Sequence, residues 1–282
     1  DTKGSSPIPP LRVNKEWVLD SKAKADAFAK VFHAKNDLVA QTQDLNLDLL
    51  PPTEFIMHPF IPMRRRRVFK LCKNLDEDVA TGGDHISSRI IRCNAWVLSL
   101  PLTLICRWLY TRGEWSDFWR EHWVIPLYKR LSPADCSNYR GVHLTTLFSK
   151  IAKKIIGGPI CDFLEKAGTW GNEQFAYRKN HSSSDMLALI LCALCFAFHS
   201  KTKIGVFCSD IKGAFDRVKT EVLIQKCWHY GVPARAIAFL EAYLAERSAK
   251  VVVGGFFSEA FPLKNQVFQG TVLGPKLWNT FL

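Results

Sequence analysis

Residues 204–210, with the sequence IGVFCSD, are an apolar run that ends in the carboxylate of Asp210. An apolar run of this length, with β-branched and aromatic side chains, predicts a buried strand. Gly213 then leads the chain toward a helix expected at about residues 220–230. A carboxylate that follows a buried strand lies at a sheet edge, where its oxygens hold hard cations; for the segment taken alone, a turn or helix cap is the commoner role. The run therefore predicts a sheet protein with Asp210 as a candidate site residue.

The rest of the chain mixes helical and strand-like patterns without a regular alternation. Apolar residues at helical spacing predict helices over residues 15–39, 144–156, 186–198 and 234–246. A Gly-Gly-Pro sequence at residues 157–159 is expected to interrupt the second of these helices before it resumes. A strand is expected over residues 123–128 and a hairpin over residues 249–263. This mixture predicts an α+β fold.

Charge and cysteine content restrict the class of partner and the compartment. The 282 residues include 38 lysines and arginines against 26 acidic residues, a formal net charge of +12. An excess of positive charge spread over a folded chain favours an anionic partner, and nucleic acid is the first candidate. The apolar run at residues 186–198 is too short to cross a membrane. Nine scattered cysteines do not form the pattern of a disulfide framework, and they indicate a reducing, intracellular compartment.

Two short patterns have both a functional and a structural interpretation. Cys192 and Cys195 have the C-x-x-C spacing of a zinc ligand pair, but no second pair accompanies them. They are therefore expected to be apolar side chains on a buried helix. The four arginines at residues 64–67 are expected to begin a solvated helix, and a nucleic-acid contact or a localisation signal is the alternative.

Four motifs follow one another in the second half of the chain. They are NYRGVHL at residues 138–144, QFAYRKN at 174–180, DIKGAFD at 210–216 and QGTVLGP at 269–275. They are preceded by TGGDHIS at residues 81–87, GEWSDFW at 113–119 and VIPLYK at 124–129. This order and spacing resembles the reverse transcriptase domain of non-LTR (LINE-like) retrotransposon polyproteins, over roughly residues 70–282. Any one motif would be a weak signal, whereas four in order are a strong one.

The resemblance implies the architecture of a right-hand polymerase. The α+β fold would comprise the fingers and a partial palm, lacking the end of the palm and the thumb. Residues 1–110 would form an N-terminal helical extension or linker that precedes the domain, residues 111–200 the fingers and residues 201–282 the partial palm. The family has a second aspartate pair on a hairpin beyond the position of Leu282, so the chain is expected to be a truncated fragment.

The DIKGAFD motif carries the implied chemistry. Asp210 matches the first catalytic aspartate of the family, which would hold divalent ions together with the backbone carbonyl of Ile211. The expected cofactor is Mg²⁺, or Mn²⁺ in its place, as a pair of ions that activate the primer 3′-hydroxyl and stabilise the leaving pyrophosphate. Phe215 matches the steric gate, whose ring clashes with a ribose 2′-hydroxyl; ordinary core packing is the alternative. Asp216 has no metal role in the family, and a salt bridge or helix cap is expected for it.

Two further motifs supply implied nucleotide contacts. Arg178 stands where an arginine of the family grips the incoming triphosphate, and Lys179 would add charge beside it. Gln269 and Gly270 match the motif that lines the nascent base pair, where glycine lets the backbone approach the nucleotide closely.

Template contacts are implied for the first motif and the helix after it. Arg140 would order the fingers or touch the template backbone. On the helix expected over residues 144–156, Lys150, Lys153 and Lys154 occupy the polar side, and Lys150 is the expected template contact. Solvation alone is the ordinary role of such exposed cations.

The motifs depart from the family pattern without losing a reacting group. Phe268 stands where proline is usual before the glutamine, and Gly213 stands where a lysine or similar residue is usual. Ala176 and Tyr177 replace a common Gly-Phe pair. Each change bears on the shape of the implied pocket.

The implied function is that of an RNA-directed DNA polymerase, a nucleotidyltransferase that adds dNTPs to a primer 3′-hydroxyl by a two-metal mechanism. The implied partners are an RNA template, a DNA primer and dNTPs, and no membrane. The resemblance leaves open the choice between nucleus and cytoplasm and the oligomeric state. Without the second aspartate pair, the fragment is expected to be inactive alone. The alternative is a non-catalytic RNA- or DNA-binding remnant of a reverse transcriptase.

Overall fold

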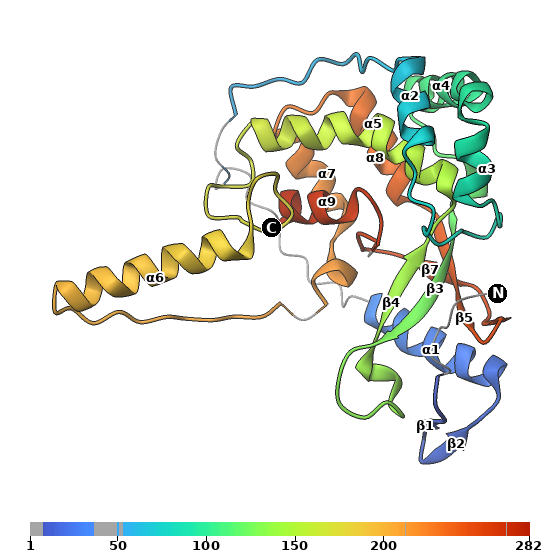
Figure 1. Ribbon diagram of the computed structural model, residues 1–282, viewed down its shortest axis with the longest axis horizontal. Helices are drawn as coiled ribbons and strands as arrows, with labels where there is room; N and C mark the ends of the chain where they lie inside the picture. Colours follow the sequence, from blue (N-terminus) through green and yellow to red (C-terminus); the bar gives the residue numbers. More distant parts are fainter. Residues whose placement is uncertain (1–7, 37–49, 51–52, 212, 269) are drawn as a thin grey trace.

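The computed structural model describes residues 8–36, 50, 53–211, 213–268 and 270–282 (Figure 1). Its sheet has the strand order β4–β3–β5–β6, and β7 also pairs with β5. The strands are β3 (Glu121–Tyr128), β4 (Tyr139–Leu144), β5 (Arg247–Val253), β6 (Phe256–Phe257) and β7 (Phe261–Leu263). The predicted strand at residues 123–128 and the predicted hairpin at residues 249–263 are both present. Helices combined with a mixed sheet agree with the predicted fold class; the division into fingers and palm stays a prediction.

Strand β3 lies between two neighbours of opposite direction. It pairs antiparallel with β4, with Val124 opposite His143, and parallel with β5, with His122 opposite Ala249. Burial alternates along β5, so that every second side chain from Arg247 onward faces the interior. One face of the sheet is therefore buried, and it includes polar side chains.

Helices pack around the sheet. The group near its upper end in Figure 1 consists of α2 (Arg65–Lys73), α3 (Ser88–Cys93), α4 (Ala95–Arg112), α5 (Leu147–Lys166), α7 (Thr220–His229), α8 (Ala234–Leu244) and α9 (Gly274–Phe281). Helix α1 (Ser21–Asn36) lies against β5, β6 and β7 instead. Short 3-10 turns are η2 (Asp117–Trp119), η3 (Cys136–Asn138) and η4 (Ala214–Arg217). The helices predicted near residues 220–230 and 234–246 are confirmed.

Helix α1 begins later than predicted. The carboxylate of Asp20 accepts a hydrogen bond of 2.8 Å from the backbone N–H of Ala23, which caps the first turn. Before it, residues 11–18 form a small hairpin of β1 (Leu11–Val13) and β2 (Glu16–Val18). Phe28 is fully buried and meets the ring of Tyr139 edge-on at 4.9 Å between ring centroids, so the helix is fixed to the β3–β4 hairpin.

Helix α5 is continuous, so the predicted interruption at residues 157–159 is wrong. A Cβ on Gly157 would lie 2.5 Å from Cδ1 of Leu273, so this glycine provides close packing rather than a break. Pro159 removes only one backbone donor, which tertiary packing of the long helix offsets. The prediction that Lys153 occupies the polar side of this helix is also wrong. Lys153 is fully buried, and its Nζ donates to Oγ1 of Thr145 at 3.1 Å.

The arginine run at residues 64–67 begins α2, as predicted, with Arg64 at the N-cap position. Arg65, however, is bound to α4 rather than simply solvated. Its Nε donates to Oγ of Ser99 at 2.9 Å, and its guanidinium lies 4.0 Å from the ring centroid of Trp96. This arginine therefore joins two helices.

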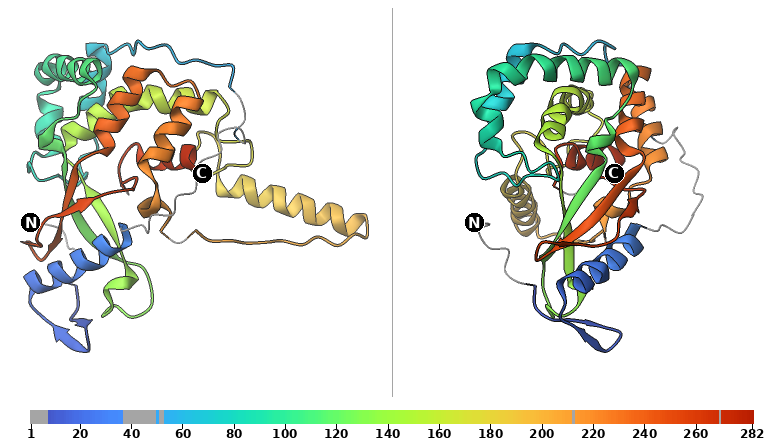
Figure 2. Two further views of the ribbon diagram at one scale, coloured as in Figure 1. Left: turned by 180° about the vertical axis from the view of Figure 1, so that it is seen from behind. Right: turned by 90° about the vertical axis from the view of Figure 1, so that its right-hand side faces the viewer.

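Helix α6 (Ser183–His199) forms as predicted but is not buried. Its first turn is closed by a capping box between Ser182 and Asp185. The helix extends away from the rest of the protein (Figure 2), and Ala197 is its one buried residue. The prediction of a buried helix is wrong because an apolar sequence predicts burial without specifying which element covers it.

The buried strand predicted at residues 204–210 is also wrong. These residues are extended and exposed, and they pair with no strand in the part of the chain that is described. A strand needs a neighbour to bind its backbone N–H and C=O groups, and hydrophobicity alone supplies none. Asp210 therefore ends an exposed segment.

No helix within the described ranges is long and apolar enough to cross a membrane. The domain boundaries at residues 110 and 200 stay predictions. Helix α1, from the first of the three segments, contacts strands of the third.

Candidate functional site

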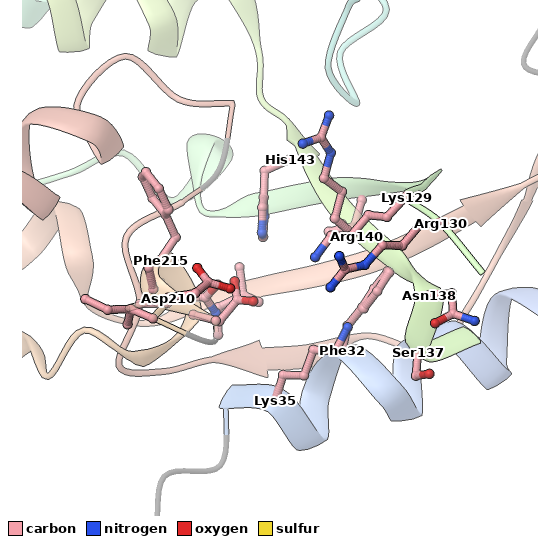
Figure 3. A pocket seen from close by; sticks show the side chains of 18 of the residues that line it. Phe32, Lys35, Lys129, Arg130, Ser137, Asn138, Arg140, His143, Asp210 and Phe215 are labelled. Carbon is pink, nitrogen blue, oxygen red and sulfur yellow. The ribbon is translucent and has the colours of Figure 1, made fainter. Parts of the chain in front are cut away.

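A cavity of about 430 Å³ opens where the β3–β4 hairpin, α1, residues 210–211 and residues 213–216 meet (Figure 3). Strand β4 supplies one wall because its side chains alternate and it is the edge strand of the sheet in the described part of the chain. Helix α1 supplies a second wall because Phe28 fixes it to the hairpin. Residues 210–211 and 213–216 supply the third wall, and Gly213 adopts a positive φ of 69° directly before η4.

The structure brings four of the predicted site residues together. Asp210, Ile211, Phe215 and Arg140 all line this cavity. Arg140 comes from the NYRGVHL motif and the others from the DIKGAFD motif, so two separate motifs meet at one place. Figure 3 shows the Asp210 carboxylate and the Arg140 guanidinium on opposite sides of the cavity.

Aromatic neighbours hold the ring of Phe215. It stacks on Trp278 of α9 with 5.9 Å between centroids and meets Tyr177 edge-on at 6.0 Å. Tyr177 belongs to the QFAYRKN motif, which therefore reaches the cavity through this ring contact. A ring held on two sides is suited to act as a fixed wall against a ligand.

Positive charge dominates the cavity. Its charged lining consists of four cations and two carboxylates: Lys35, Lys129, Arg130, Arg140, Asp210 and Asp216. Burial raises the pKa of Asp216, while Lys35, Lys129 and Arg217 act in the opposite direction. The excess of cations favours an anionic ligand.

Three other predicted contacts lie outside the lining of this cavity. Nη1 of Arg178 donates to the backbone carbonyls of Gly171 at 2.5 Å and Gln174 at 3.3 Å. The backbone N–H of Lys179 donates to Glu165 at 3.3 Å. Nζ of Lys150 donates to the carbonyl of Ala80 at 3.3 Å, and Lys150 lines a second, smaller cavity beside α2.

Of the QGTVLGP motif, Gln269 lies outside the described residues. Gly270 has a φ of 80°, and a Cβ there would lie 3.3 Å from Val142 and 3.4 Å from the carbonyl oxygen of His143. A glycine therefore lets this loop approach strand β4 closely. Phe268, which replaces the usual proline, is buried beneath it.

Several cavity residues have no counterpart in the sequence-based prediction. Phe32 and Lys35 come from α1, whose position against the sheet is a long-range feature. Lys129 and Arg130 follow β3 directly, and a basic pair after a predicted strand was an available signal. His143 belongs to a recognised motif but was not singled out.

The groups that could bind a divalent ion are of the right chemical type, but there are fewer of them than a metal site needs. The Asp210 carboxylate and the Ile211 carbonyl are oxygen ligands of the type that Mg²⁺ prefers. Within the described ranges, no three His, Cys, Asp or Glu side chains are grouped closely enough to hold a metal ion. This also applies to Cys192 and Cys195, which are exposed free thiols on α6.

Comparisons with known proteins support the family resemblance. The model of the reverse transcriptase (RNA-dependent DNA polymerase) family matches residues 129–282. The "Probable RNA-directed DNA polymerase from transposon BS" of Drosophila melanogaster is 26% identical over 230 residues, which cover 79% of this chain and 25% of that protein. The "RNA-directed DNA polymerase from mobile element jockey" of the same species is 27% identical over 233 residues, or 79% of this chain and 24% of that protein. A jockey polymerase of Drosophila funebris is 26% identical over 272 residues, or 93% of this chain and 28% of its own length.

The chain thus spans about a quarter of the length of the curated relatives it matches. The family match covers more than half of the chain and contains all four motifs. Together with these relatives, it confirms the resemblance to non-LTR retrotransposon sequences, and the chain belongs to the reverse transcriptase (RNA-dependent DNA polymerase) family.

Proposed function

We propose that this chain is the nucleotide- and template-binding part of an RNA-directed DNA polymerase, whose intact parent adds dNTPs to a primer. The observation that carries the proposal is the meeting of Asp210, Phe215 and Arg140 in one cavity. Family membership and the names of the relatives support it.

The cations of the cavity would bind phosphate oxygens. Arg140 and Arg130 offer planar guanidinium groups that pair with phosphate in a bidentate manner, and Lys35 and Lys129 add point charges. Arg178, Lys179 and Lys150 remain expected contacts of the intact protein, as do Gln269 and Gly270.

Phe215 would select the sugar. Its ring lines the cavity, and its contacts with Trp278 and Tyr177 restrict its movement. A ribose 2′-hydroxyl at this position would therefore clash with the ring. Asp210 and Ile211 would supply oxygen ligands for Mg²⁺, which would bring charge stabilisation to the transferring phosphoryl group.

A second candidate is an RNA- or DNA-binding remnant that performs no chemistry. The observation in its favour is that the described residues contain no group of three metal-binding side chains. Phosphate binding by the cavity is common to both candidates.

Primer extension and binding, measured on the purified 282-residue chain, test the proposal. We expect a fluorescent RNA–DNA primer-template to bind with an affinity that falls steeply with salt, and we expect no extension with Mg²⁺ or Mn²⁺. Extension that disappears in Asp210→Ala would show that these residues polymerise unaided and would exclude the remnant. Failure to bind any nucleic acid or dNTP at low salt would contradict both candidates.

A further inference from the structure

Three polar side chains lie in a row on the buried face of the sheet. They are Arg247 of β5, His122 of β3 and His143 of β4, which are 2%, 0% and 7% exposed. His122 is opposite Ala249, two residues after Arg247, and His143 is opposite Val124, two residues after His122. Because side chains alternate along strands, all three point to the same side of the sheet. The register of three adjacent strands thus places the three side chains in one row.

The hydrogen bonds of this row assign each proton. Nη1 of Arg247 lies 2.9 Å from Nε2 of His122. A guanidinium only donates, so Nε2 of His122 accepts and its ring proton is on Nδ1. That Nδ1 lies 3.2 Å from Nδ1 of His143, so it donates to it. His143 therefore carries its own proton on Nε2.

Both imidazoles are neutral at physiological pH, as this assignment requires. Burial lowers the pKa of His143 to about 4, assisted by the charges of Lys153 and Arg247. Burial, Arg247, His143 and Lys153 lower the pKa of His122 in the same direction. Arg247 keeps a pKa of about 10 despite its burial, so it remains the charged donor at the start of the row.

The surroundings fix the positions of all three groups. Nε of Arg247 donates to the carbonyl of Tyr243 at 2.6 Å, and Nη1 donates to that of Trp119 at 3.1 Å. The ring of Phe268 lies 4.7 Å from His122, 5.8 Å from His143 and 5.1 Å from the Arg247 guanidinium, measured to ring centroids. Phe268, the residue that replaces the usual proline, therefore packs against the whole row.

The row ends in the cavity. His143 is part of the cavity lining, and Figure 3 shows its imidazole pointing into the space between Phe215 and Arg140. Gln266 lines the same cavity with a buried Nε2 that finds no hydrogen-bond partner among the described residues. A neutral donor on the wall of a cationic cavity suits an acceptor oxygen, and phosphate is the oxygen-bearing group that the surrounding cations attract.

We propose that Arg247 and His122 act in series as positioning residues that hold His143 in its Nε2–H form, and that this N–H donates to a phosphate oxygen of a ligand in the cavity. The assignment of the ligand rests on the proposed function, whereas the proton positions do not. The phosphate could belong to an incoming nucleotide or to a nucleic-acid backbone, and the two sources are separated below.

Nitrogen NMR of the imidazole rings tests the series on the 282-residue chain labelled with ¹⁵N-histidine. We expect the long-range ¹H–¹⁵N pattern of a single Nδ1–H form for His122 and a single Nε2–H form for His143, whereas the exposed His199 shows an average of both forms. Arg247→Met places an apolar chain among the same aromatic rings and should convert His143 to a mixture, and Arg247→Lys should restore one form. An Nδ1–H form of His143 in the unmodified chain, or no change in Arg247→Met, would overturn the series.

Binding of two probes tests the ligand, using dTTP and a ten-residue oligo(rA). His143→Leu removes the donor and should weaken binding of at least one probe about ten-fold, the effect of one hydrogen bond to a charged group. His143→Gln keeps an N–H donor and should stay within about three-fold. An effect on dTTP alone identifies the incoming nucleotide, and an effect on oligo(rA) alone identifies the backbone.

If His143→Leu binds both probes normally, the ligand assignment is wrong. If the unmodified chain binds neither probe, the proposed function fails together with the ligand assignment, and the NMR result still decides the series. Thermal unfolding of each variant separates a lost contact from a lost fold.

Discussion

The backbone carbonyl of Phe215 accepts a 3.0 Å hydrogen bond from the backbone N–H of Val267. Val267 immediately precedes Phe268 and the QGTVLGP motif, so this bond joins the loop of the DIKGAFD motif to the loop of the last motif. Trp278 of α9, which follows the QGTVLGP motif in the chain, stacks on the ring of Phe215. The position of the Phe215 ring therefore depends on residues that follow it by more than fifty positions in the chain.

Replacing Phe215 by valine is expected to reduce the preference for dUTP over UTP in competition binding. The smaller side chain leaves room for a 2′-hydroxyl, and loss of the contacts to Trp278 and Tyr177 should cost about 1–3 kcal/mol of unfolding free energy. Phe256→Val on β6 is the control, because Phe256 is exposed and lies outside the cavity. An unchanged preference in Phe215→Val would remove Phe215 from sugar selection.

Two adjacent glycines of α5 are expected to respond in opposite directions to alanine. Gly157→Ala would place a Cβ 2.5 Å from the buried Leu273, and such overpacking costs about 1–3 kcal/mol. The nearest atom to a Cβ on Gly158 is Nη2 of Arg67 at 3.7 Å, so Gly158→Ala should gain about 0.5–1 kcal/mol from helix propensity. Urea denaturation measures both. Equal effects would mean that Gly157 does not pack against Leu273.

Removing one cation from the cavity is expected to lower the salt dependence of RNA binding. For Arg140→Gln, the slope of log K against log salt concentration should fall by about 1, because one phosphate contact is lost. Arg235→Gln on α8 is the matched control, since Arg235 is exposed and not part of the cavity. The same change of slope in both variants would show that the charge acts non-specifically.

His143 is expected to make the protein less stable as the pH falls below about 6.5. The unfolded chain protonates this histidine near that pH, whereas burial lowers the folded pKa to about 4, so the unfolded state binds more protons between these values. The loss should reach about 2–3 kcal/mol at pH 4. Urea denaturation from pH 7 to pH 4 should show a smaller loss in His143→Gln than in the unmodified chain. Identical pH profiles for the two proteins would contradict the burial of His143.

The apolar face of α6 is expected to be dispensable for the stability of the described structure. Leu191 is 60% exposed and Phe198 82% exposed, so exchanging Leu187, Leu191 and Phe198 together for glutamine should change the unfolding free energy by less than about 0.5 kcal/mol. The same variant should bind less of a hydrophobic dye and associate less in light scattering. Ile151→Gln on α5 is the buried control and should unfold the chain. A loss of stability in the triple variant would show that α6 is covered.

Local patterns predicted the elements whose partners are close in sequence. The hairpin at residues 249–263 was predictable because its strands pair with each other, and the helices of residues 220–246 were predictable because each has its own apolar face. The pattern failed at residues 157–159, where Leu273 determines whether glycine breaks or packs, and at residues 204–210, where hydrophobicity does not supply a partner strand.

Only those cavity residues that belong to recognised motifs could be predicted from the sequence. Asp210, Ile211, Phe215 and Arg140 were found through resemblance, and the structure brings them together. Lys35 was missed because the docking of α1 depends on contacts such as Phe28 with Tyr139, which no local pattern encodes.

The role of His143 could not be predicted from its own motif because it depends on a contact with a neighbouring strand. Its hydrogen-bond partner His122 lies on β3, 21 residues earlier, and the register of the two strands decides that their rings meet. The strand predicted at residues 123–128 begins just after His122, and no strand was predicted at the position of β4, so the sequence pattern gave no sign that the two rings meet.

The parallel pairing of β3 with β5 has a consequence for synthesis of the chain. Glu121 pairs with Ser248, which is 127 residues later in the chain, so β3 cannot pair with β5 until that part of the chain has been synthesised. At a translation rate of about 5–20 residues per second, that wait is roughly 6 to 25 s. During this time β3 and β4 have only each other as strand partners in the described structure, and a two-stranded sheet is marginally stable in water. The nascent chain thus exposes for seconds the edge of β3 that later pairs with β5, and an exposed strand edge is a site where other chains can pair.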